Sequence, residues 1–271
     1  MTADESQPDT SEEWRRILVG EDPNLPRLRR FWSKVRSAPR CKLCASPFSG
    51  PGRLLTRVVM HGASNANPLL CSSCFWSLKK HPGGAEIEVS VLFADIRGST
   101  GIAERTSAAE FTGLVQKFYR RAAKAVDEHD GIVDKFLGDG IMVLFIPVIS
   151  GDAHARRAVE AGEAMLAAVA DPELVAGGVR VGAGVHTGDA FVGTVGSDDR
   201  LDFTALGDTV NVAARLGSEA AAGELLVSAV AWQAAGRSDS PERRSLHVKG
   251  RAEPLDVVVL RRAGDAVAAD G

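Results

Sequence analysis

The sequence predicts an α+β fold in which strands and helices follow the order β-α-β-β-α-β, preceded by a small cysteine-rich module. Three observations carry this prediction. The apolar segments after residue 86 alternate between strand and helix periodicity. All four cysteines lie before residue 75, and the breaker cluster His81-Pro82-Gly83-Gly84 divides the two parts. At 271 residues the chain is long enough for one full domain and a smaller module.

The elements of the larger part are assigned in order from their apolar spacing. Ile87–Ala94 is a short apolar run typical of a buried strand, and Ala103–His129 has the spacing of a helix, which Asp130-Gly131 ends. The remaining expected elements are a hairpin of Ile132–Leu137 and Ile141–Pro147, a helix at 152–170, strands at 179–186 and 190–195 around Thr187-Gly188-Asp189, a short helix from Thr209, and strands at 224–228, 245–248 and 255–260. This order is that of a ferredoxin-like α+β fold.

Composition divides the chain into segments. We expect a disordered acidic tip and a short helix over 1–26, a basic cysteine-rich module over 27–80, a linker at 81–85, the main domain over 86–261 and a tail at 262–271. Residues 27–85 contain 11 Lys and Arg and no acidic residue, whereas the rest of the chain has 21 basic and 35 acidic residues, a balance of −14. Such a split is typical of parts that attract each other or that bind different partners.

No segment is typical of a membrane span or of a targeting signal. The longest apolar run, Ile141–Ile149, is interrupted by Pro147 and is shorter than the ~20 residues that a spanning helix needs. The segment Met1–Glu13 is polar and acidic, unlike a secretory or transit peptide. We therefore expect a soluble, cytoplasmic protein.

Two segments place carboxylates where a cation and a phosphate can be held. Asp95 ends the first strand and is followed by Gly98, Ser99 and Thr100 before a helix. This arrangement offers backbone N–H groups to a phosphate, although taken alone it fits an ordinary helix cap equally well. Asp139 lies between two glycines at the hairpin tip, where strand pairing brings it beside Asp95. With two divalent ions about 3.5–4 Å apart, such a carboxylate pair forms a site for in-line displacement at phosphorus.

A third segment, Leu206–Arg215, adds a polar helix face. Asn211 and Arg215 are four residues apart and share that face. A neutral donor and a fixed cation suit charge that develops on a phosphoryl group. The alternative is an ordinary amphipathic helix on which Arg215 makes a surface salt bridge.

Together, these segments resemble the class III adenylate and guanylate cyclases, and the resemblance extends from about Glu86 to Leu260. It implies that residues 86–261 form a catalytic domain. It also implies that Asp95 and Asp139, with the backbone of Ile96, bind two Mg²⁺ or Mn²⁺ ions per active site. In that family one ion activates the ribose 3′-hydroxyl for attack on the α-phosphorus, and the other holds the triphosphate.

The resemblance assigns further roles to the C-terminal half of the domain. Asn211 and Arg215 match the pair that orients the ribose and stabilises the transition state, and Lys249 matches a lysine that holds the outgoing phosphates. In the family, the metal carboxylates come from one chain, and the purine readers and the Asn/Arg pair come from the other. The resemblance therefore implies a homodimer with two equivalent sites and an inactive monomer.

Lys135 and Thr204 stand where the family places its purine-reading pair. A lysine only donates hydrogen bonds, and adenine N1 accepts one whereas guanine N1 carries a proton, so Lys135 favours ATP. Thr204 replaces an aspartate of many relatives, and its hydroxyl rejects guanine less firmly. A guanylate or mixed-specificity cyclase is the alternative. Gly182 stands where many relatives carry a phosphate-binding arginine, with Arg180 two residues earlier.

The cysteine module contains two Cys-x-x-Cys knuckles with 26 residues between them. Tetrahedral Zn²⁺ is bound by four thiolates presented in pairs, although this spacing is longer than in common zinc ribbons. We predict a structural Zn²⁺ on Cys41, Cys44, Cys71 and Cys74. An iron–sulfur cluster, a redox disulfide and free thiols are the alternatives.

Two functions from different classes fit these residues. The first is an adenylate cyclase, a phosphorus–oxygen lyase that converts ATP to 3′,5′-cyclic AMP and pyrophosphate and is regulated by a basic module docked on the acidic domain. The second is a nucleic-acid-binding zinc module on a cyclase-like dimerisation domain, because the basic module also carries aromatic residues. The complete set of metal, purine and transition-state residues favours the enzyme, since a binding scaffold needs none of them.

Overall fold

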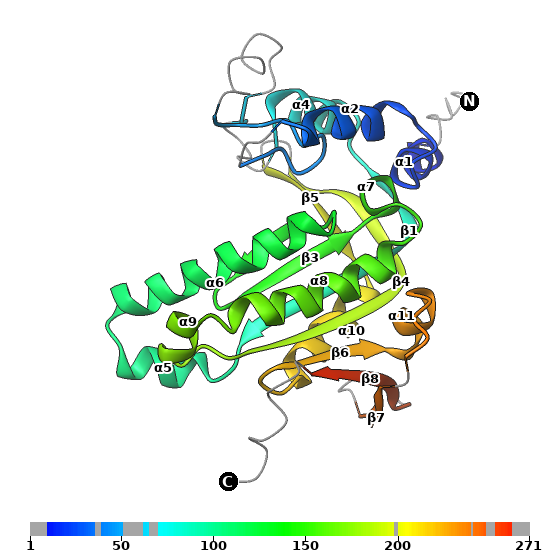
Figure 1. The fold of residues 1–271 in the computed structure, drawn as a ribbon. Coiled ribbons are helices and arrows are strands. Elements are labelled where there is room, and N and C mark those ends of the chain that lie inside the picture. Colours follow the sequence, from blue (N-terminus) through cyan, green and yellow to red (C-terminus); the bar gives the residue numbers. More distant parts are fainter. Residues whose placement is uncertain are drawn as a thin grey trace, which may run out of the picture. The chain divides into compact units, whose positions relative to one another are not determined.

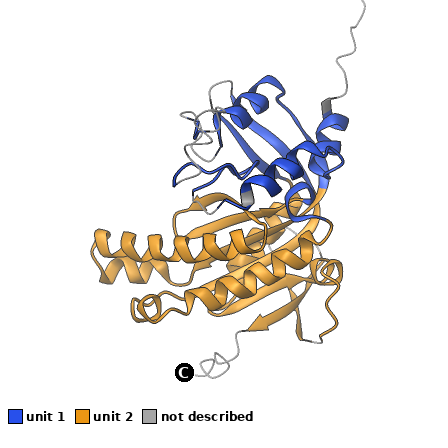
Figure 2. Ribbon diagram, turned by 45° about the horizontal axis from the view of Figure 1, so that its top comes forward, with its two compact units in different colours: residues 1–87, 147–151, 190–206 blue, residues 88–146, 152–189, 207–271 orange. Residues whose placement is uncertain are grey.

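The computed structural model describes residues 10–35, 39–50, 62–64, 70–197, 200–239, 241–247 and 253–261. The first nine residues of the expected tip, Lys249 and the expected tail lie outside the described residues. The chain divides into two compact units, which Figure 2 colours separately. Unit 1 comprises residues 1–87, 147–151 and 190–206, and unit 2 comprises residues 88–146, 152–189 and 207–271. The N-terminal module therefore shares a unit with two short segments of the main domain.

An eight-stranded sheet is formed by the described residues. Its strands are β1 (Gly84–Ile96), β2 (Ile132–Leu137), β3 (Gly140–Phe145), β4 (Val181–Ser197), β5 (Arg200–Leu206), β6 (Glu224–Ser228), β7 (Glu242–Leu246) and β8 (Leu255–Arg261). They lie in the order β2-β3-β1-β4-β6-β8-β7, with β5 paired to β4. The chain order β1-α6-β2-β3-α8-β4, with these strands arranged β2-β3-β1-β4, confirms the predicted ferredoxin-like α+β fold.

Helices cover both faces of the sheet in unit 2. Its helices are α5 (Ser99–Arg105), α6 (Ala108–Glu128), α8 (His154–Val169), α9 (Pro172–Ala176), α10 (Asp208–Glu219) and α11 (Ala229–Ala234). Helices α6 and α8 lie side by side over one face (Figure 1). Leu225 and Val227 of β6 face their core, whereas Leu226 between them packs with Val212 and Leu216 of α10. Successive side chains of β6 therefore pack into two hydrophobic cores, one on each face of the sheet.

Unit 1 contains short helices and one hairpin. Its described helices are α1 (Thr10–Leu18), α2 (Asn24–Ser33), α4 (Ser72–Lys80) and α7 (Pro147–Ser150) (Figure 1). Strand β5 and the second half of β4 belong to the same unit. Trp14, Leu18, Trp32 and Leu78 are buried in this unit. None of the helices in the described ranges combines the length and the apolar character that a membrane span requires.

Several boundaries differ from those expected. The helix expected at 103–129 is two helices, α5 and α6, because the Ser107 side chain and Glu110 form a capping box that starts α6 anew. The two strands expected at 179–186 and 190–195 are one strand, β4. Gly188, expected in a turn, lies within that strand, where a Cβ would meet Thr209 Oγ1 at 2.9 Å. Strand β1 begins at Gly84 and so includes the last two residues of the expected linker.

Candidate active site

Asp95 and Asp139 lie next to each other at one end of the sheet. Asp95 in β1 is paired with Gly140 in β3, and the Ile96 N–H donates to the Asp139 carbonyl over 3.1 Å. Gly138 has a φ of 73°, the left-handed backbone that lets this two-residue turn close without steric cost. The hairpin therefore presents Asp139 beside the end of β1, as the sequence predicted.

A phenol from α6 holds this turn, and the sequence analysis did not single it out. Tyr119 Oη donates to the Gly138 carbonyl over 2.5 Å, and its ring packs on Phe136 with the centroids 4.2 Å apart. Burial, and then the negative charge of Asp139, raise the pKa of Tyr119. The signal available in the sequence was that Tyr119 is the one tyrosine of the chain.

Arg97 balances the carboxylates and ties β1 to α10. Its guanidinium forms an ion pair with Asp95 Oδ1 and donates to the Ser218 and Ala220 carbonyls over 2.6 and 3.2 Å. Burial lowers the pKa of Arg97, while Asp139 opposes that change. Apart from this ion pair, the buried Asp95 Oδ1 accepts no hydrogen bond from any described residue. A carboxylate oxygen of this kind, with a second carboxylate alongside, suits a divalent cation.

The segment after β1 starts a helix earlier than predicted, because Ser99 and Thr100, expected before the helix, lie within it. Gly98 has a φ of 65° and precedes α5, whose first two residues are Ser99 and Thr100. The left-handed conformation at Gly98 turns the chain from strand to helix within a few residues. Phosphate binding by the backbone N–H groups of this segment stays a prediction.

Helix α10 has the amphipathic character expected of it. Val212 and Leu216 are buried against the sheet, whereas Asn211 is exposed and Arg215 is half-buried. Asn211 and Arg215 are one helical turn apart, so both side chains leave the same side of the helix. Their proposed contacts with a nucleotide are not tested by this geometry.

The two purine-reading candidates belong to different units. Lys135 lies in β2 of unit 2 with its Nζ 3.5 Å from the buried carboxylate of Asp134. Thr204 lies in β5 of unit 1, is 3% exposed, and is paired with Gly193 of β4. Base reading by these two side chains stays a prediction, and so does the phosphate contact of Lys249, which lies outside the described residues.

The position where many relatives carry an arginine has no room for a side chain. A Cβ on Gly182 would lie 2.5 Å from the Ala220 carbonyl oxygen. Arg180, two residues earlier, donates to the Val175 and Val179 carbonyls over 3.1 Å each. Its guanidinium therefore caps carbonyl groups at and just after the end of α9.

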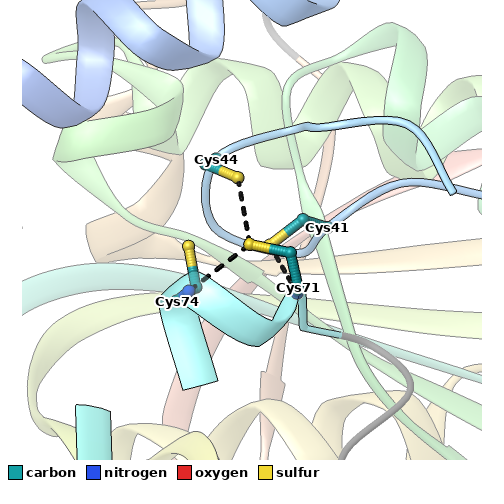
Figure 3. A group of neighbouring side chains, drawn as sticks. All are labelled: Cys41, Cys44, Cys71 and Cys74. Carbon is teal, nitrogen blue, oxygen red and sulfur yellow. Dashed lines mark hydrogen bonds between the residues drawn. The ribbon is translucent and has the colours of Figure 1, made fainter. Parts of the chain in front are cut away.

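The four cysteines converge on one point (Figure 3). Cys41 and Cys44 come from the described segment 39–50, and Cys71 and Cys74 from the start of α4. Their Sγ atoms all lie within 4.8 Å of one another, and the Cys44 and Cys71 Sγ atoms are 3.7 Å apart. Four thiolates about 2.3 Å from one tetrahedral ion lie about 3.8 Å from each other. The cluster therefore fits a single tetrahedral ion.

Hydrogen bonds among the four cysteines lower the pKa of two of the thiols and raise the pKa of the other two. The hydrogen bond with Cys41 is the main cause that lowers the pKa of Cys44 to about 6, and it also holds the pKa of Cys71 far below its usual range. The same contacts raise the pKa of Cys41 and of Cys74. The thiolate is the form of cysteine that binds a metal.

Comparisons with known proteins identify the family of this chain. The family described as "Adenylate and Guanylate cyclase catalytic domain" matches residues 84–261. "Adenylate cyclase 1" of Rhizobium meliloti (strain 1021) is 36% identical over 134 residues, which are 48% of this chain and 20% of that protein. The adenylate cyclase of Anabaena cylindrica is 35% identical over 137 residues, 47% of this chain and 26% of that protein. The match thus spans about a quarter of the length of these relatives.

Solved structures show the same relationship. The adenylyl cyclase CyaB from P. aeruginosa is 32% identical with a TM-score of 0.59, covering 67% of this chain and 98% of that one. The guanylyl cyclase Cya2 is 28% identical with a TM-score of 0.63, covering 68% of this chain and 97% of that one. The chain therefore belongs to the adenylate and guanylate cyclase catalytic domain family.

Proposed function

We propose that this protein is an adenylate cyclase that converts ATP to 3′,5′-cyclic AMP and pyrophosphate in a homodimer. The observation that carries the proposal is the placement of Asp95 beside Asp139, with a buried Asp95 oxygen whose one described partner is the Arg97 guanidinium. In a member of the cyclase family, these two aspartates are the expected ligands of the catalytic cations.

The residues of the site divide the work of the reaction. Asp95, Asp139 and the backbone of Ile96 would hold two Mg²⁺ or Mn²⁺ ions, which activate the attacking hydroxyl and neutralise phosphate charge when bound. Asn211 and Arg215 orient the ribose and offset charge that develops on the phosphoryl group. The N–H groups at residues 98–100 and the side chain of Lys249 complete the phosphate contacts.

Two features support the finer assignments. Lys135 can only donate to the base, which favours adenine, although guanylyl cyclases are also among the similar structures. A guanylate or mixed-specificity cyclase is therefore the alternative.

Phe136 and Leu137, both 45% exposed beside the Asp139 turn, supply an apolar surface suited to a second copy of the chain.

The cysteine cluster is proposed to hold one structural Zn²⁺. The short distances among the four sulfurs support a mononuclear site over an iron–sulfur cluster, because a cluster inserts several metal ions between the thiolates. None of the four cysteines forms a disulfide in the structure. Metal analysis of the purified protein tests this assignment directly, with one zinc and no iron per chain as the expected result.

The experiment that tests the function is a cyclase assay with ATP and with GTP in Mg²⁺ and in Mn²⁺. Wild-type protein should form cyclic AMP, and Asp95→Ala or Asp139→Ala should abolish its formation because each removes a cation ligand. Asp256→Ala, which changes an exposed aspartate on β8, is the control and should retain activity. Activity within a few-fold of wild type in both site variants would refute the mechanism.

A further inference from the structure

Lys42 lies inside the first cysteine knuckle, and its side chain reaches β5. It is only 9% exposed, and its Nζ donates to the Phe203 carbonyl over 2.9 Å, although 161 residues separate the two in sequence. The next residue of β5 is Thr204, the proposed purine reader. One charged hydrogen bond therefore links the knuckle to the strand that carries the base-reading side chain.

The backbone of the knuckle is held from a second side. Arg29 of α2 donates to the carbonyls of Lys42 and Leu43, each over 3.1 Å. Cys41 and Cys44 flank these two residues, so an ion bound by the sulfurs would fix both ends of the same short segment. A bound ion and Arg29 would together fix the backbone position of Lys42, from which its side chain extends to β5.

Strand β5 is held at this point by one neighbouring strand and by apolar contacts of Phe203. Among the described strands, β5 pairs only with β4. The Phe203 ring stacks on Trp14, with the centroids 6.4 Å apart, and Phe203 lines a cavity of about 330 Å³ that also borders Leu43 and Cys74. The Lys42 hydrogen bond and these apolar contacts therefore act at the same residue of β5.

We propose that Lys42 is a positioning residue through which the metal-loaded knuckle sets the place of β5, and with it the affinity and base preference for the nucleotide. This inference rests on the proposed function, because the role of Thr204 belongs to that function. Loss of the metal, or of the Lys42 donor, lets β5 move and weakens recognition of the purine.

The test uses full-length, zinc-loaded protein and three variants. Lys42→Met removes the donor but keeps the apolar stem, Lys42→Arg restores a donor, and Lys34→Met changes an exposed lysine of the same module. Hydrogen–deuterium exchange of residues 200–206 is measured with zinc content, and KM and kcat are measured with ATP and GTP.

In Lys42→Met we expect exchange in β5 to rise by about tenfold or more, because a hydrogen bond to a charged group is lost. KM for ATP should rise about threefold to tenfold with a smaller change in kcat, and the preference for ATP over GTP should fall. Zinc content should stay at the wild-type level, Lys42→Arg should recover part of the loss, and Lys34→Met should match wild type. Removing zinc from wild type should raise exchange in β5 in the same way.

The proposal is overturned if Lys42→Met matches Lys34→Met in both exchange and KM, or if zinc removal leaves exchange in β5 unchanged. Failure of the proposed function gives a different result, namely wild-type protein that forms no cyclic nucleotide. The exchange measurement needs no turnover, so it decides whether Lys42 holds β5 in that case as well.

Discussion

At the scale of single residues, the position of Asp139 depends on a side chain from another element. The Tyr119 hydroxyl donates to the Gly138 carbonyl, and the Tyr119 ring rests on Phe136. No spacing rule connects residues 119 and 138, because their contact arises from the packing of α6 on β2. Tyr119 thus holds the turn that carries Asp139.

Replacing Tyr119 by Phe should weaken the hold on the catalytic cations. The stack on Phe136 is kept, while one hydrogen bond of about 1 kcal/mol is lost from the turn. We expect the Mn²⁺ concentration for half-maximal activity to rise about threefold to tenfold, as measured by metal titration of the cyclase rate. Thr112→Val, which removes an exposed hydroxyl from the same helix, is the control. An unchanged metal dependence would show that Tyr119 does not position Asp139.

Lys135 offers a test of base selection at the same scale. Lys135→Glu replaces a donor by an acceptor, which suits the protonated N1 of guanine, so the ratio of GTP to ATP turnover should increase. Competition assays with both nucleotides measure that ratio. Lys124→Glu, a charge reversal on the exposed side of α6, should leave it unchanged. The same ratio in both variants would mean that Lys135 does not read the purine.

At the scale of elements, the sheet end formed by β6, β7 and β8 is held by a buried carboxylate. Glu224 is 4% exposed, and its oxygens accept from Arg244 of β7 and Arg261 of β8. Burial alone would raise the pKa of Glu224, but the hydrogen bonds from Arg244, the Ala221 N–H and Arg261 lower it overall. Ionised Glu224 therefore stabilises the folded state.

Glu224→Gln should destabilise the protein at neutral pH, by about 1–3 kcal/mol, because two arginines lose a charged partner. The folded pKa lies below the usual value of 4.5, so this contribution is present above pH 4.5 and is lost as the pH falls through the folded pKa. Urea unfolding at pH 7 and at pH 4 should show the difference from wild type shrinking in acid. Glu242→Gln, an exposed partner of the same arginines, should have a smaller effect. An equal difference at both pH values would contradict this explanation.

At the scale of the whole molecule, the proposed homodimer predicts that activity needs residues from two chains. Asp95→Ala and Asn211→Ala chains should each be inactive alone, but a mixture should regain partial activity because one hybrid site keeps all its residues. Cyclic AMP formation is measured after mixing, and mixed dimers are verified by differently tagged chains. Mixed dimers without activity would argue against a site shared between protomers.

The arrangement of unit 1 bears on how the module works. The basic module shares this unit with residues 190–206, and Lys42 contacts Phe203 within it. Regulation of the cyclase domain by this module stays a prediction, because the contact is with a backbone carbonyl rather than with the acidic residues that the charge split pointed to. Nucleic-acid binding by the module is the alternative.

Local patterns in the sequence were sufficient for several elements of the site. The β2–β3 hairpin, the placement of Asp139 beside Asp95 and the strand at 224–228 follow from apolar periodicity and turn residues, which act over a few neighbouring positions. The four cysteines, paired in two knuckles, also identified their own cluster. These features depend on residues close in sequence or on simple strand pairing.

The remaining features depend on tertiary packing. It made 181–197 one strand, left no space for a side chain at Gly182, and brought Lys42 to Phe203. Each of these outcomes depends on contacts between segments far apart in the chain, and such contacts arise when whole elements pack together. Apolar periodicity and turn residues along the chain were sufficient to predict the fold class, whereas the packing of whole elements sets which distant residues contact the candidate site.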